Sequence, residues 1–390
     1  MTTKKFKEIE TNYEEIDQTK LNIEDRTRTN LFAWNGQFSP QFIEALLDKY
    51  SETNFLVIDP FVGSGTTLIE CARKNLKSYG IELNVAPYLM AKTYELVNYS
   101  IESREKIIDK IDNFILMQKD DELIIDNLKN EINNSEDKEY VTILSTLVIL
   151  MDIYNKNVNT GLLNKNWEKL RNIILELPFS KNKIIVDRGD ARYIPLNNDT
   201  ADLLITSPPY INVFNYHQKY RKSVEALDYN VLSIAKKEFG SNRKNRSNRI
   251  LTAIQYCIDM SLSINEAIRV CKKDARMIYV VGRESAVLGY SFRNSELIYN
   301  ICTEIFDLRF EIKQERVFKN RYGKMIYEDI LHFLNNKNFI DDEEYIIKQS
   351  KLIAKKYLIK LLEETDENEK NRKYLEEAIK KVGTVKKSEV

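Results

Sequence analysis

Short, mostly apolar runs that end in turn or acidic residues alternate along this chain with stretches of helical periodicity. The apolar runs span residues 55–61, 77–83, 183–190, 201–207 and 275–282, and their length and composition predict buried strands. Between the first two runs, residues 66–75 have apolar positions at helical spacing. A strand, a helix and a strand in this order predict a right-handed parallel crossover. The whole pattern predicts a doubly wound, Rossmann-like α/β sheet.

The remaining regular patterns predict a hairpin and two helical segments. Residues 310–318 and 325–333 are β-rich and flank a short segment that contains a glycine, which predicts an antiparallel hairpin. Helical periodicity from about residue 101 to 180 predicts a helical insertion, and a charged helical tail begins near residue 341, with its last residues, VKKSEV, frayed. We divide the chain into an N-terminal arm with the first part of the sheet domain (1–98), the insertion (99–181), the rest of the sheet domain (182–336) and the tail (337–390).

Composition narrows the class of protein. The chain has 390 residues, 43% of them hydrophobic, which is enough for a full core. Its charged first thirty residues predict no signal peptide, and the longest apolar run, near residues 141–153, is too short to span a bilayer, so a cytoplasmic location is expected. The cysteines Cys71, Cys257, Cys271 and Cys302 lie far apart, which predicts buried thiols without a disulfide framework or a metal site. Because the net charge is zero, any nucleic-acid contact requires a local basic patch.

A glycine-containing turn, DPFVGSGTT at residues 59–67, follows the first predicted strand. Gly63 and Gly65 allow a ligand to approach the backbone at the start of a helix, where free N–H groups bind carboxylates or phosphates. A tight strand-to-helix turn explains the same pattern without a ligand. No lysine follows Gly65 and there is no third glycine, so neither the P-loop nor the dinucleotide fingerprint matches.

Two acids follow later strands at positions where open α/β sheets bind ligands. Glu82 ends the second strand about twenty residues after the glycine turn, a spacing typical of an acid that accepts hydrogen bonds from ribose hydroxyls. A solvated glutamate is the alternative. Asp190, which Ala191 follows, comes after the third strand and is placed to accept a hydrogen bond from an adenine amine.

The segment Thr206-Ser207-Pro208-Pro209-Tyr210 follows the fourth strand. Its two prolines end the strand and fix the directions of the Ser207 side chain and the Pro208 carbonyl, which form a rigid pair of acceptors. Such a pair can hold an exocyclic amine towards a methyl donor and favour the tetrahedral nitrogen that forms during attack. Tyr210 offers a ring for stacking on an extruded base, whereas an aromatic core residue is the alternative interpretation.

These motifs resemble those of the amino-methylating DNA methyltransferases. DPFVGSGTT, the acid in GIELN and TSPPY are similar to motifs I, II and IV of that family, RGDAR is similar to motif III, and FSPQF at residues 38–42 is similar to motif X. The order of the motifs excludes the circularly permuted subgroup. The resemblance implies S-adenosylmethionine as the cofactor and assigns to it the residues Phe38, Ser39, Pro40, Asp59, Phe61, Gly63, Gly65, Thr66, Glu82, Asp190 and Ala191.

The resemblance also implies the reaction and the target. Serine in motif IV is typical of cytosine-N4 enzymes, whereas aspartate or asparagine is typical of adenine-N6 enzymes, and the catalytic residues would be Ser207, Pro208, Pro209 and Tyr210. Methylation at cytosine C5 requires a nucleophilic cysteine after a proline, and none of the seven prolines precedes a cysteine. Direct transfer to nitrogen needs neither a metal nor a covalent intermediate. No general base is assigned, and His217 is interpreted as a structural or DNA-contacting residue.

A basic segment at residues 236–249, KKEFGSNRKNRSNR, follows the catalytic motif and predicts a mobile loop that contacts the phosphates of double-stranded DNA. The residues assigned to this role are Lys236, Lys237, Arg243, Lys244, Arg246 and Arg249. A solvated surface loop is the alternative. A second basic candidate lies in the hairpin and consists of Arg316, Lys319, Arg321 and Lys324.

The leading hypothesis is a site-specific DNA cytosine-N4 methyltransferase of a restriction-modification or phage-defence system, in which a cognate restriction endonuclease is a candidate partner. The alternatives are an adenine-N6 DNA methyltransferase, an RNA guanine-N2 methyltransferase and a DNA-binding subunit with a silent methyltransferase fold. The long insertion between motifs II and III matches no known target-recognition domain, so sequence readout is assigned to neither the insertion nor the basic loop.

Overall fold

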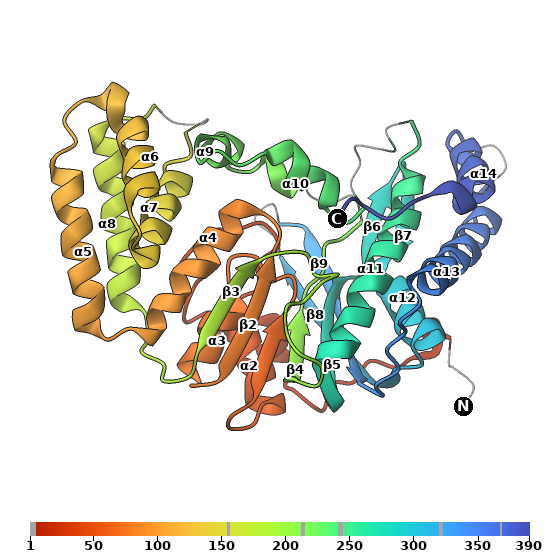
Figure 1. Cartoon of the computed structure of the whole chain (residues 1–390). Coiled ribbons are helices and arrows are strands. Elements are labelled where there is room, and N and C mark those ends of the chain that lie inside the picture. The colour runs from red at the N-terminus through yellow and green to blue at the C-terminus, as the bar shows by residue number, and fades with distance from the viewer. Residues whose placement is uncertain are drawn as a thin grey trace.

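The computed structural model of the chain describes residues 5–153, 157–211, 215–240, 245, 247–319, 323–366 and 369–390. Its centre is a seven-stranded sheet in the order β3-β2-β1-β4-β5-β9-β8 (Figure 1). Neighbours among β1 to β5 run parallel, β9 runs antiparallel to β5, and β8 runs antiparallel to β9. The strands are β1 (Leu56–Asp59), β2 (Lys77–Glu82), β3 (Ile184–Arg188), β4 (Ala201–Thr206), β5 (Cys271–Gly282), β8 (Arg309–Lys319) and β9 (Met325–Leu334). The predicted doubly wound sheet with a C-terminal hairpin is confirmed.

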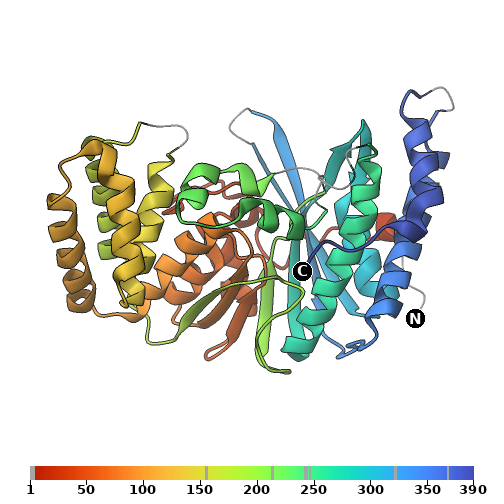
Figure 2. The same ribbon diagram turned by 45° about the horizontal axis from the view of Figure 1, so that its top comes forward.

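Helices cover both faces of the sheet, and the side chains of its inner strands alternate between two cores (Figures 1 and 2). Val57 of β1 and Leu203 of β4 point into the core beneath the first set of helices, whereas Ile58 and Leu204 point into the opposite core. The first set is α2 (Pro40–Tyr50), α3 (Thr66–Arg73) and α4 (Val85–Thr93), and the second set is α11 (Ile250–Val270), α12 (Asn294–Asn300), α13 (Glu343–Glu363) and α14 (Arg372–Lys381). Burial on both faces explains why these strands are continuous apolar runs in the sequence.

The segment between β2 and β3 is helical, and its buried side chains continue the core beneath α4. Its helices are α5 (Ile101–Leu116), α6 (Ile124–Asn134), α7 (Lys138–Met151) and α8 (Thr160–Glu176), which form the bundle on the left of Figure 1. Arg104 is almost fully buried and donates hydrogen bonds to backbone carbonyls of the segments that precede and follow the bundle in the sequence, among them those of Leu96 and Leu177. The bundle is therefore held against the sheet domain by polar contacts as well as by apolar packing.

Shorter elements connect these layers. A two-stranded ribbon that the sequence pattern did not predict consists of β6 (Glu284–Val287) and β7 (Tyr290–Arg293). Its turn places Leu288 and Gly289 at φ values of 53° and 90°, as the twist of a two-residue hairpin requires. The other short helices are η1 (Phe6–Glu8), α1 (Gln18–Asn22), η2 (Tyr94–Asn98), η3 (Asp121–Leu123), η4 (Tyr216–Gln218), α9 (Arg221–Ala226), α10 (Val231–Lys237), η5 (Ile301–Ile305) and η6 (Val382–Thr384).

The end of the chain corrects one expectation. The last residues were expected to be frayed, but they return from α14 to the carboxyl edge of the sheet beside α10 (Figures 1 and 2). Val385 and Ser388 are buried there. The prediction failed because the partners of these residues lie more than a hundred positions away in the sequence.

The four cysteines are buried and free, as predicted. Within the described ranges, no helix has both the length and the apolar character needed to cross a bilayer.

Candidate active site

A cavity that is partly open to solvent lies where the carboxyl ends of the parallel strands meet. This is the edge at which open α/β sheets bind ligands, next to the point where the strand order reverses between β1 and β4. Most of the predicted site residues line the cavity: Phe38, Phe61, Gly63, Thr66, Glu82, Asp190, Ala191, Ser207, Pro209 and Tyr210. The fold therefore brings the five predicted motifs together at one site.

The other predicted residues, Ser39, Pro40, Asp59, Gly65 and Pro208, do not line this cavity. Ser39 and Pro40 begin α2, and the Ser39 hydroxyl accepts a hydrogen bond from Arg316 Nη2 at 2.9 Å. Thr66, in the cavity wall, is linked to the residues just before α2 through Asn30. The Thr66 hydroxyl donates to Asn30 Oδ1, and the Asn30 amide donates to the carbonyl of Phe38. Several residues assigned to the cofactor therefore support the wall from behind.

Asp59 joins the glycine turn to the catalytic strand. Its carboxylate is only 1% exposed and accepts hydrogen bonds from Thr67 Oγ1 at 2.7 Å, Thr206 Oγ1 at 2.6 Å and the Phe61 N–H at 3.1 Å. Burial raises the pKa of Asp59 to about 6, against the lowering effect of these donors. Asp59 thus fixes the position of the motif that carries Ser207 relative to the turn that carries Gly63.

We expect Asp59→Ala to lower the free energy of unfolding by about 3 kcal/mol, because buried hydroxyl and amide donors lose their acceptor. Asp59→Asn is the matched control: its amide oxygen can still accept from Thr206 and Phe61, and the Thr67 hydroxyl can turn to accept from the amide nitrogen. Urea denaturation measures both variants. Equal stability of Asp59→Ala and the wild-type protein would contradict this role.

The two glycines of the turn correct a second expectation. Their N–H groups were expected to be free for a ligand, but Gly63 donates to Glu82 Oε2 at 3.0 Å and Gly65 donates to the carbonyl of Val62 at 2.9 Å. Gly65, at φ 90°, also allows α4 and the start of η2 to approach, because an added Cβ would lie 3.0 Å from Ala91 Cα and 2.7 Å from the ring of Tyr94. The turn therefore shapes the cavity wall through its geometry.

Glu82 presents its carboxylate at the cavity wall. Oε1 accepts the N–H of Asn84 at 2.8 Å and Oε2 accepts the N–H of Gly63, so both oxygens are held in fixed directions. Each carboxylate oxygen has a further lone pair. Burial, together with the nearby Glu238 carboxylate, raises the pKa of Glu82 to about 7. The arrangement suits a bidentate acceptor for two adjacent hydroxyl groups.

Asp190 lines the cavity but is already paired. Arg192 Nε donates to its Oδ1 at 2.9 Å and Arg192 Nη2 donates to its Oδ2 at 2.6 Å. This fork fixes the direction of the carboxylate and of the adjacent Ala191 backbone. Adenine recognition by Asp190 remains a prediction.

Ser207 and Tyr210 form the start of a hydrogen-bonded chain that sequence analysis missed. Ser207 Oγ lies 3.4 Å from the hydroxyl of Tyr210, which donates to Glu328 Oε1 on β9 at 3.0 Å. The Tyr210 ring lies so close to Gly282 that an added Cβ would approach it to 2.7 Å. Burial raises the pKa of Tyr210 well above its usual value, so its hydroxyl stays protonated.

Arg316 continues this chain and corrects a third expectation. It was a candidate for contacts with DNA, but it is only 5% exposed, with Nη1 3.3 Å from Glu328 Oε2 and its guanidinium over the rings of Phe42 and Phe318. The alternation of β8 turns this side chain inward, which a charged run in a hairpin does not reveal. Arg316 therefore connects the hairpin to the start of α2, where Ser39 accepts its hydrogen bond.

Aromatic side chains and a histidine complete the cavity. Trp34 and Tyr216 stack with ring centroids 6.1 Å apart, and Phe239 packs edge-on against Phe61 at 5.3 Å. His217 Nδ1 lies 2.8 Å from Glu238 Oε2, which holds His217 in the wall. No motif marked Trp34 or Tyr216, although aromatic residues recur in both of their segments, 32–38 and 216–220.

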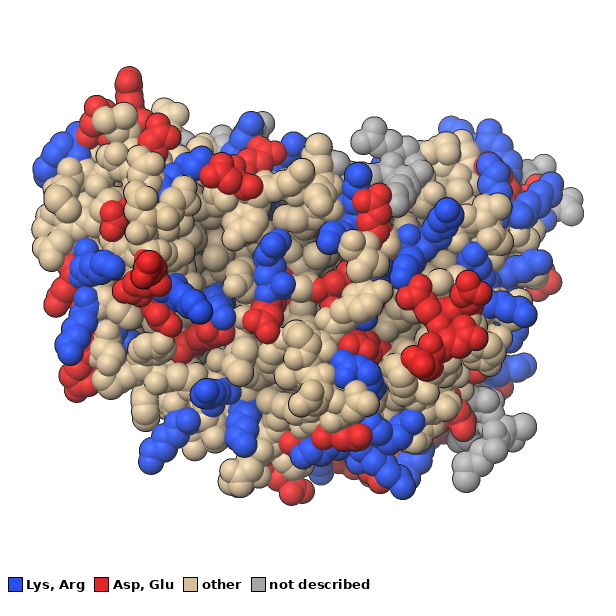
Figure 3. All heavy atoms as spheres, in the orientation of Figure 1, with Lys and Arg blue, Asp and Glu red and all other residues tan. Residues whose placement is uncertain are grey.

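Part of the predicted basic loop lies next to the cavity. Lys236 and Lys237 end α10, residues 238–240 line the cavity, and Arg249 is exposed at the start of α11. The expectation of a loop is therefore wrong for residues 236 and 237, which are helical, whereas residues 238–240 form a turn. Arg243, Lys244, Arg246 and Arg321 lie outside the described residues. Cationic and acidic side chains are intermixed on the face that Figure 3 shows, and contact with DNA remains a prediction.

Comparison with known proteins bears on the family. Residues 2–92, which carry motifs X, I and II, match the family described as DNA methylase, which comprises N6 and N4 methyltransferases. The resemblance to the amino-methylating DNA methyltransferases is confirmed. A curated relative, the type II methyltransferase M.MjaII of Methanocaldococcus jannaschii, is 31% identical over 151 residues, which cover 35% of this chain and 28% of the relative. The chain thus matches less than a third of that relative's length.

Solved structures are similar in general architecture. A protein of Methanosarcina mazei, described as an S-adenosylmethionine-dependent methyltransferase, has a TM-score of 0.36 and 10% identity over 74% of this chain and 96% of its own. The ribosomal RNA methyltransferase AviRa of Streptomyces viridochromogenes has a TM-score of 0.34 and 8% identity over 83% of this chain and 95% of its own. These values are too low to bear on substrate.

The cavity fits S-adenosylmethionine by the chemistry of its walls. Glu82 offers a fixed bidentate acceptor for the ribose hydroxyls, and the carboxylates of Glu82, Asp190 and Glu238 together with aromatic faces favour a cationic sulfonium. Within the described residues, no group of three or more His, Cys, Asp or Glu side chains is arranged to hold a metal ion.

Proposed function

We propose that this protein is an S-adenosylmethionine-dependent DNA methyltransferase that methylates the exocyclic N4 amine of a flipped cytosine. The observation that carries the proposal is the juxtaposition of Ser207 and Tyr210 of the TSPPY motif with Glu82 and the glycine turn in one cavity. The family match of residues 2–92 supports the cofactor and the DNA substrate. Serine in place of aspartate or asparagine supports cytosine N4 over adenine N6.

The cofactor would supply a methyl group activated by a sulfonium: the amine nitrogen would attack the methyl carbon in line as the C–S bond breaks, and the sulfur would leave as the thioether of S-adenosylhomocysteine. Glu82 binds the ribose, while Phe61, Phe38 and Ala191 provide apolar walls that exclude water from the donor. Ser207 Oγ and the Pro208 carbonyl accept the hydrogens of the amine and orient its nitrogen towards the methyl group. These residues thus bring the two reactants into line.

The hydrogen-bonded chain from Ser207 offers a route for the proton that the amine loses. The N–H bond breaks as the C–N bond forms, the proton passes to Ser207 Oγ, the serine hydroxyl proton passes to Tyr210, and the tyrosine proton passes to Glu328, which returns it to solvent. The distances of 3.4 and 3.0 Å along this chain allow the transfers once substrate has tightened the site. Arg316 pairs with the Glu328 carboxylate at the end of this chain, with Nη1 3.3 Å from Oε2.

We expect Glu328→Gln and Tyr210→Phe each to lower kcat about tenfold or more, because proton transfer by a positioned group contributes that much or more. The affinity for S-adenosylhomocysteine should change little. Because both residues act in one chain, the double variant should lose no more activity than the worse single variant. Glu311→Gln, at an exposed position of β8, is the control and should keep full activity. Additive losses in the double variant would contradict the relay.

The proposal that DNA is the partner rests on the charge and the position of basic side chains near the cavity. Lys236 and Lys237 adjoin residues 238–240 in the cavity wall, and Arg249 is exposed at the start of α11. Phosphate contacts from these side chains would hold the duplex while the target base leaves the stack. Site-specific modification of this kind suits a restriction-modification or phage-defence system with a cognate endonuclease.

A labelled-methyl assay tests the proposed function. The purified protein is incubated with S-adenosylmethionine that carries a labelled methyl group and with duplex DNA, RNA or neither. We expect label in DNA alone and competitive inhibition by S-adenosylhomocysteine. Label in RNA but not in DNA would favour a guanine-N2 RNA enzyme, and no saturable cofactor binding would favour a silent subunit; either result contradicts the proposal.

A further inference from the structure

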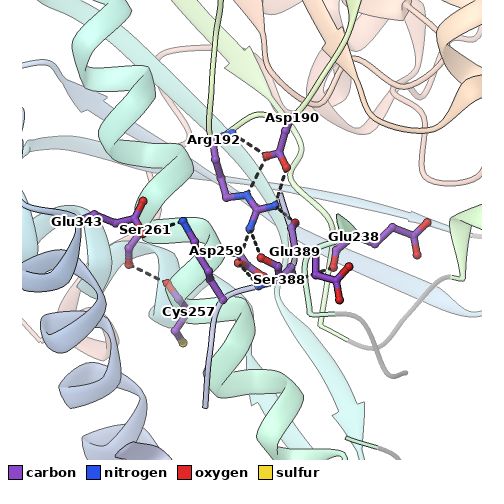
Figure 4. Close-up of polar contacts among 10 residues, drawn as sticks. Asp190, Arg192, Glu238, Cys257, Asp259, Ser261, Glu343, Ser388 and Glu389 are labelled. Atoms are coloured by element: carbon purple, nitrogen blue, oxygen red, sulfur yellow. Dashed lines mark hydrogen bonds and ion pairs between the residues drawn. The ribbon is translucent and has the colours of Figure 1, made fainter. Parts of the chain in front are cut away.

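The last six residues of the chain, 385–390, which we call the tail segment, are tied into the wall of the cavity (Figure 4). Ser388 is 1% exposed, and its N–H donates to Asp259 Oδ1 of α11 at 3.0 Å. Its hydroxyl lies 2.6 Å from Asp259 Oδ2 and 3.1 Å from the carbonyl oxygen of Glu238, so its single proton can serve either acceptor. The tail segment therefore links α11 to residue 238 in the cavity wall.

Arg192 is the centre of this network, as Figure 4 shows. It is 4% exposed and binds Asp190 through two nitrogens and Asp259 through Nη1 at 2.9 Å. The tail segment supplies two more acceptors, the carbonyl of Ser388 at 3.2 Å and that of Glu389 at 2.7 Å. A buried guanidinium is tolerated only when its donors are satisfied. Without the tail segment, Arg192 would lose two acceptors and Asp259 would lose two donors.

The same network reaches two separate walls of the cavity. Asp190, held by Arg192, belongs to the wall after β3, whereas Glu238 and Phe239 belong to the segment after α10. Phe239 lies beneath the Arg192 guanidinium, 5.2 Å from its ring centroid, and the N–H of Glu389 donates to the carbonyl of Lys236 at 3.2 Å. One segment of chain thus fixes both walls relative to each other.

We propose that the tail segment is a clamp on the cofactor site, in which Ser388 and Arg192 are positioning residues that hold Asp190 and residues 236–240 around the ligand. The inference rests on the proposed function of the cavity as the cofactor site. Docking of the clamp and binding of the cofactor then strengthen each other by the same factor, because coupling between two sites is reciprocal. The clamp makes cofactor affinity depend on a segment whose own residues do not line the cavity.

Calorimetric titration with S-adenosylhomocysteine tests the clamp. We expect the dissociation constant to rise about fivefold in Ser388→Ala and about tenfold or more in a variant that ends at Thr384. Lys386→Ala, an exposed position in the same segment, is the matched control and should bind as the wild-type protein does. Unchanged affinity in both Ser388→Ala and the shortened variant would overturn the clamp while leaving the cofactor site intact. Absence of binding by the wild-type protein would overturn the cofactor site and the clamp together.

Hydrogen exchange on the unaltered protein gives a second readout that does not depend on how the variants fold. The amides of Ser388 and Glu389 donate to Asp259 and to Lys236. Their exchange should slow about fivefold or more when S-adenosylhomocysteine saturates the protein, as reciprocal coupling demands. Exchange of both amides that is indifferent to a bound ligand would overturn the clamp, because a merely structural tail would behave in that way.

Discussion

Glu82→Ala is expected to raise the dissociation constant for S-adenosylhomocysteine roughly 100-fold. A carboxylate that accepts two ribose hydroxyls makes two charge-assisted hydrogen bonds, each worth about 1.5–3 kcal/mol, and the lower end of that range, about 3 kcal/mol for both, corresponds to a factor slightly above 100. Glu82→Gln is the matched variant, because it keeps the shape and one acceptor oxygen, and we expect a change of about tenfold. Calorimetry measures both variants. Wild-type affinity in Glu82→Ala would contradict the assignment of this residue.

The pH dependence of ligand binding distinguishes the effect of the negative charge of Glu82 from the effect of its side-chain shape. Since the pKa of Glu82 is raised to about 7, the carboxylate in the wild-type protein becomes protonated as the pH falls from 8 to 6. The protonated form offers fewer acceptor lone pairs, so affinity should be highest above the pKa and should fall below it, by at most about tenfold per pH unit. Glu82→Gln should show a flat profile over this range. A wild-type profile as flat as that of the variant would show that Glu82 does not bind the ligand.

Ser207→Ala has the second large expected effect, on turnover. The hydroxyl that orients the amine and stabilises the developing tetrahedral nitrogen is lost, and removal of one such preorganised group costs about 10²–10³ in kcat. The dissociation constant for S-adenosylhomocysteine should stay within about twofold, since Ser207 acts on the amine and leaves the wall formed by Glu82 unchanged. Single-turnover transfer of labelled methyl groups separates the two quantities.

The control for this prediction is Ser233→Ala, at an exposed position of α10, which should keep full activity. A kcat of Ser207→Ala within a few-fold of the wild-type value would contradict the role of the serine. So would a loss of activity explained entirely by weaker cofactor binding.

The sequence predicted the parts of the structure that local chemistry determines. Buried parallel strands are continuous apolar runs, and the turns that follow them contain glycine, proline or an acid. The sequence therefore predicted β1 to β5 and the positions of Glu82 and Ser207 at the ends of strands. The hairpin of β8 and β9 was readable for the same reason. The β6–β7 ribbon was missed because its strands are only four residues long.

The features that were mispredicted depend on partners distant in sequence. Ser388 is buried because it forms hydrogen bonds with Asp259 and Glu238. Arg316 is buried because it donates hydrogen bonds to Glu328 and Ser39. The N–H of Gly63 was assigned to a ligand because nothing in the turn shows that Glu82 reaches back to it. A charged or polar segment therefore gives a wrong prediction of exposure when the fold places a buried hydrogen-bond partner next to it.

Nucleoside mass spectrometry of DNA from cells that express the protein tests the central claim most directly. The proposed function predicts N4-methylcytosine in cells with the wild-type protein, and none above background in cells with Ser207→Ala produced at the same level. Methyl groups only at adenine N6 would contradict the base assignment. DNA without any methylated amine, from cells in which the folded protein is present, would contradict the account as a whole.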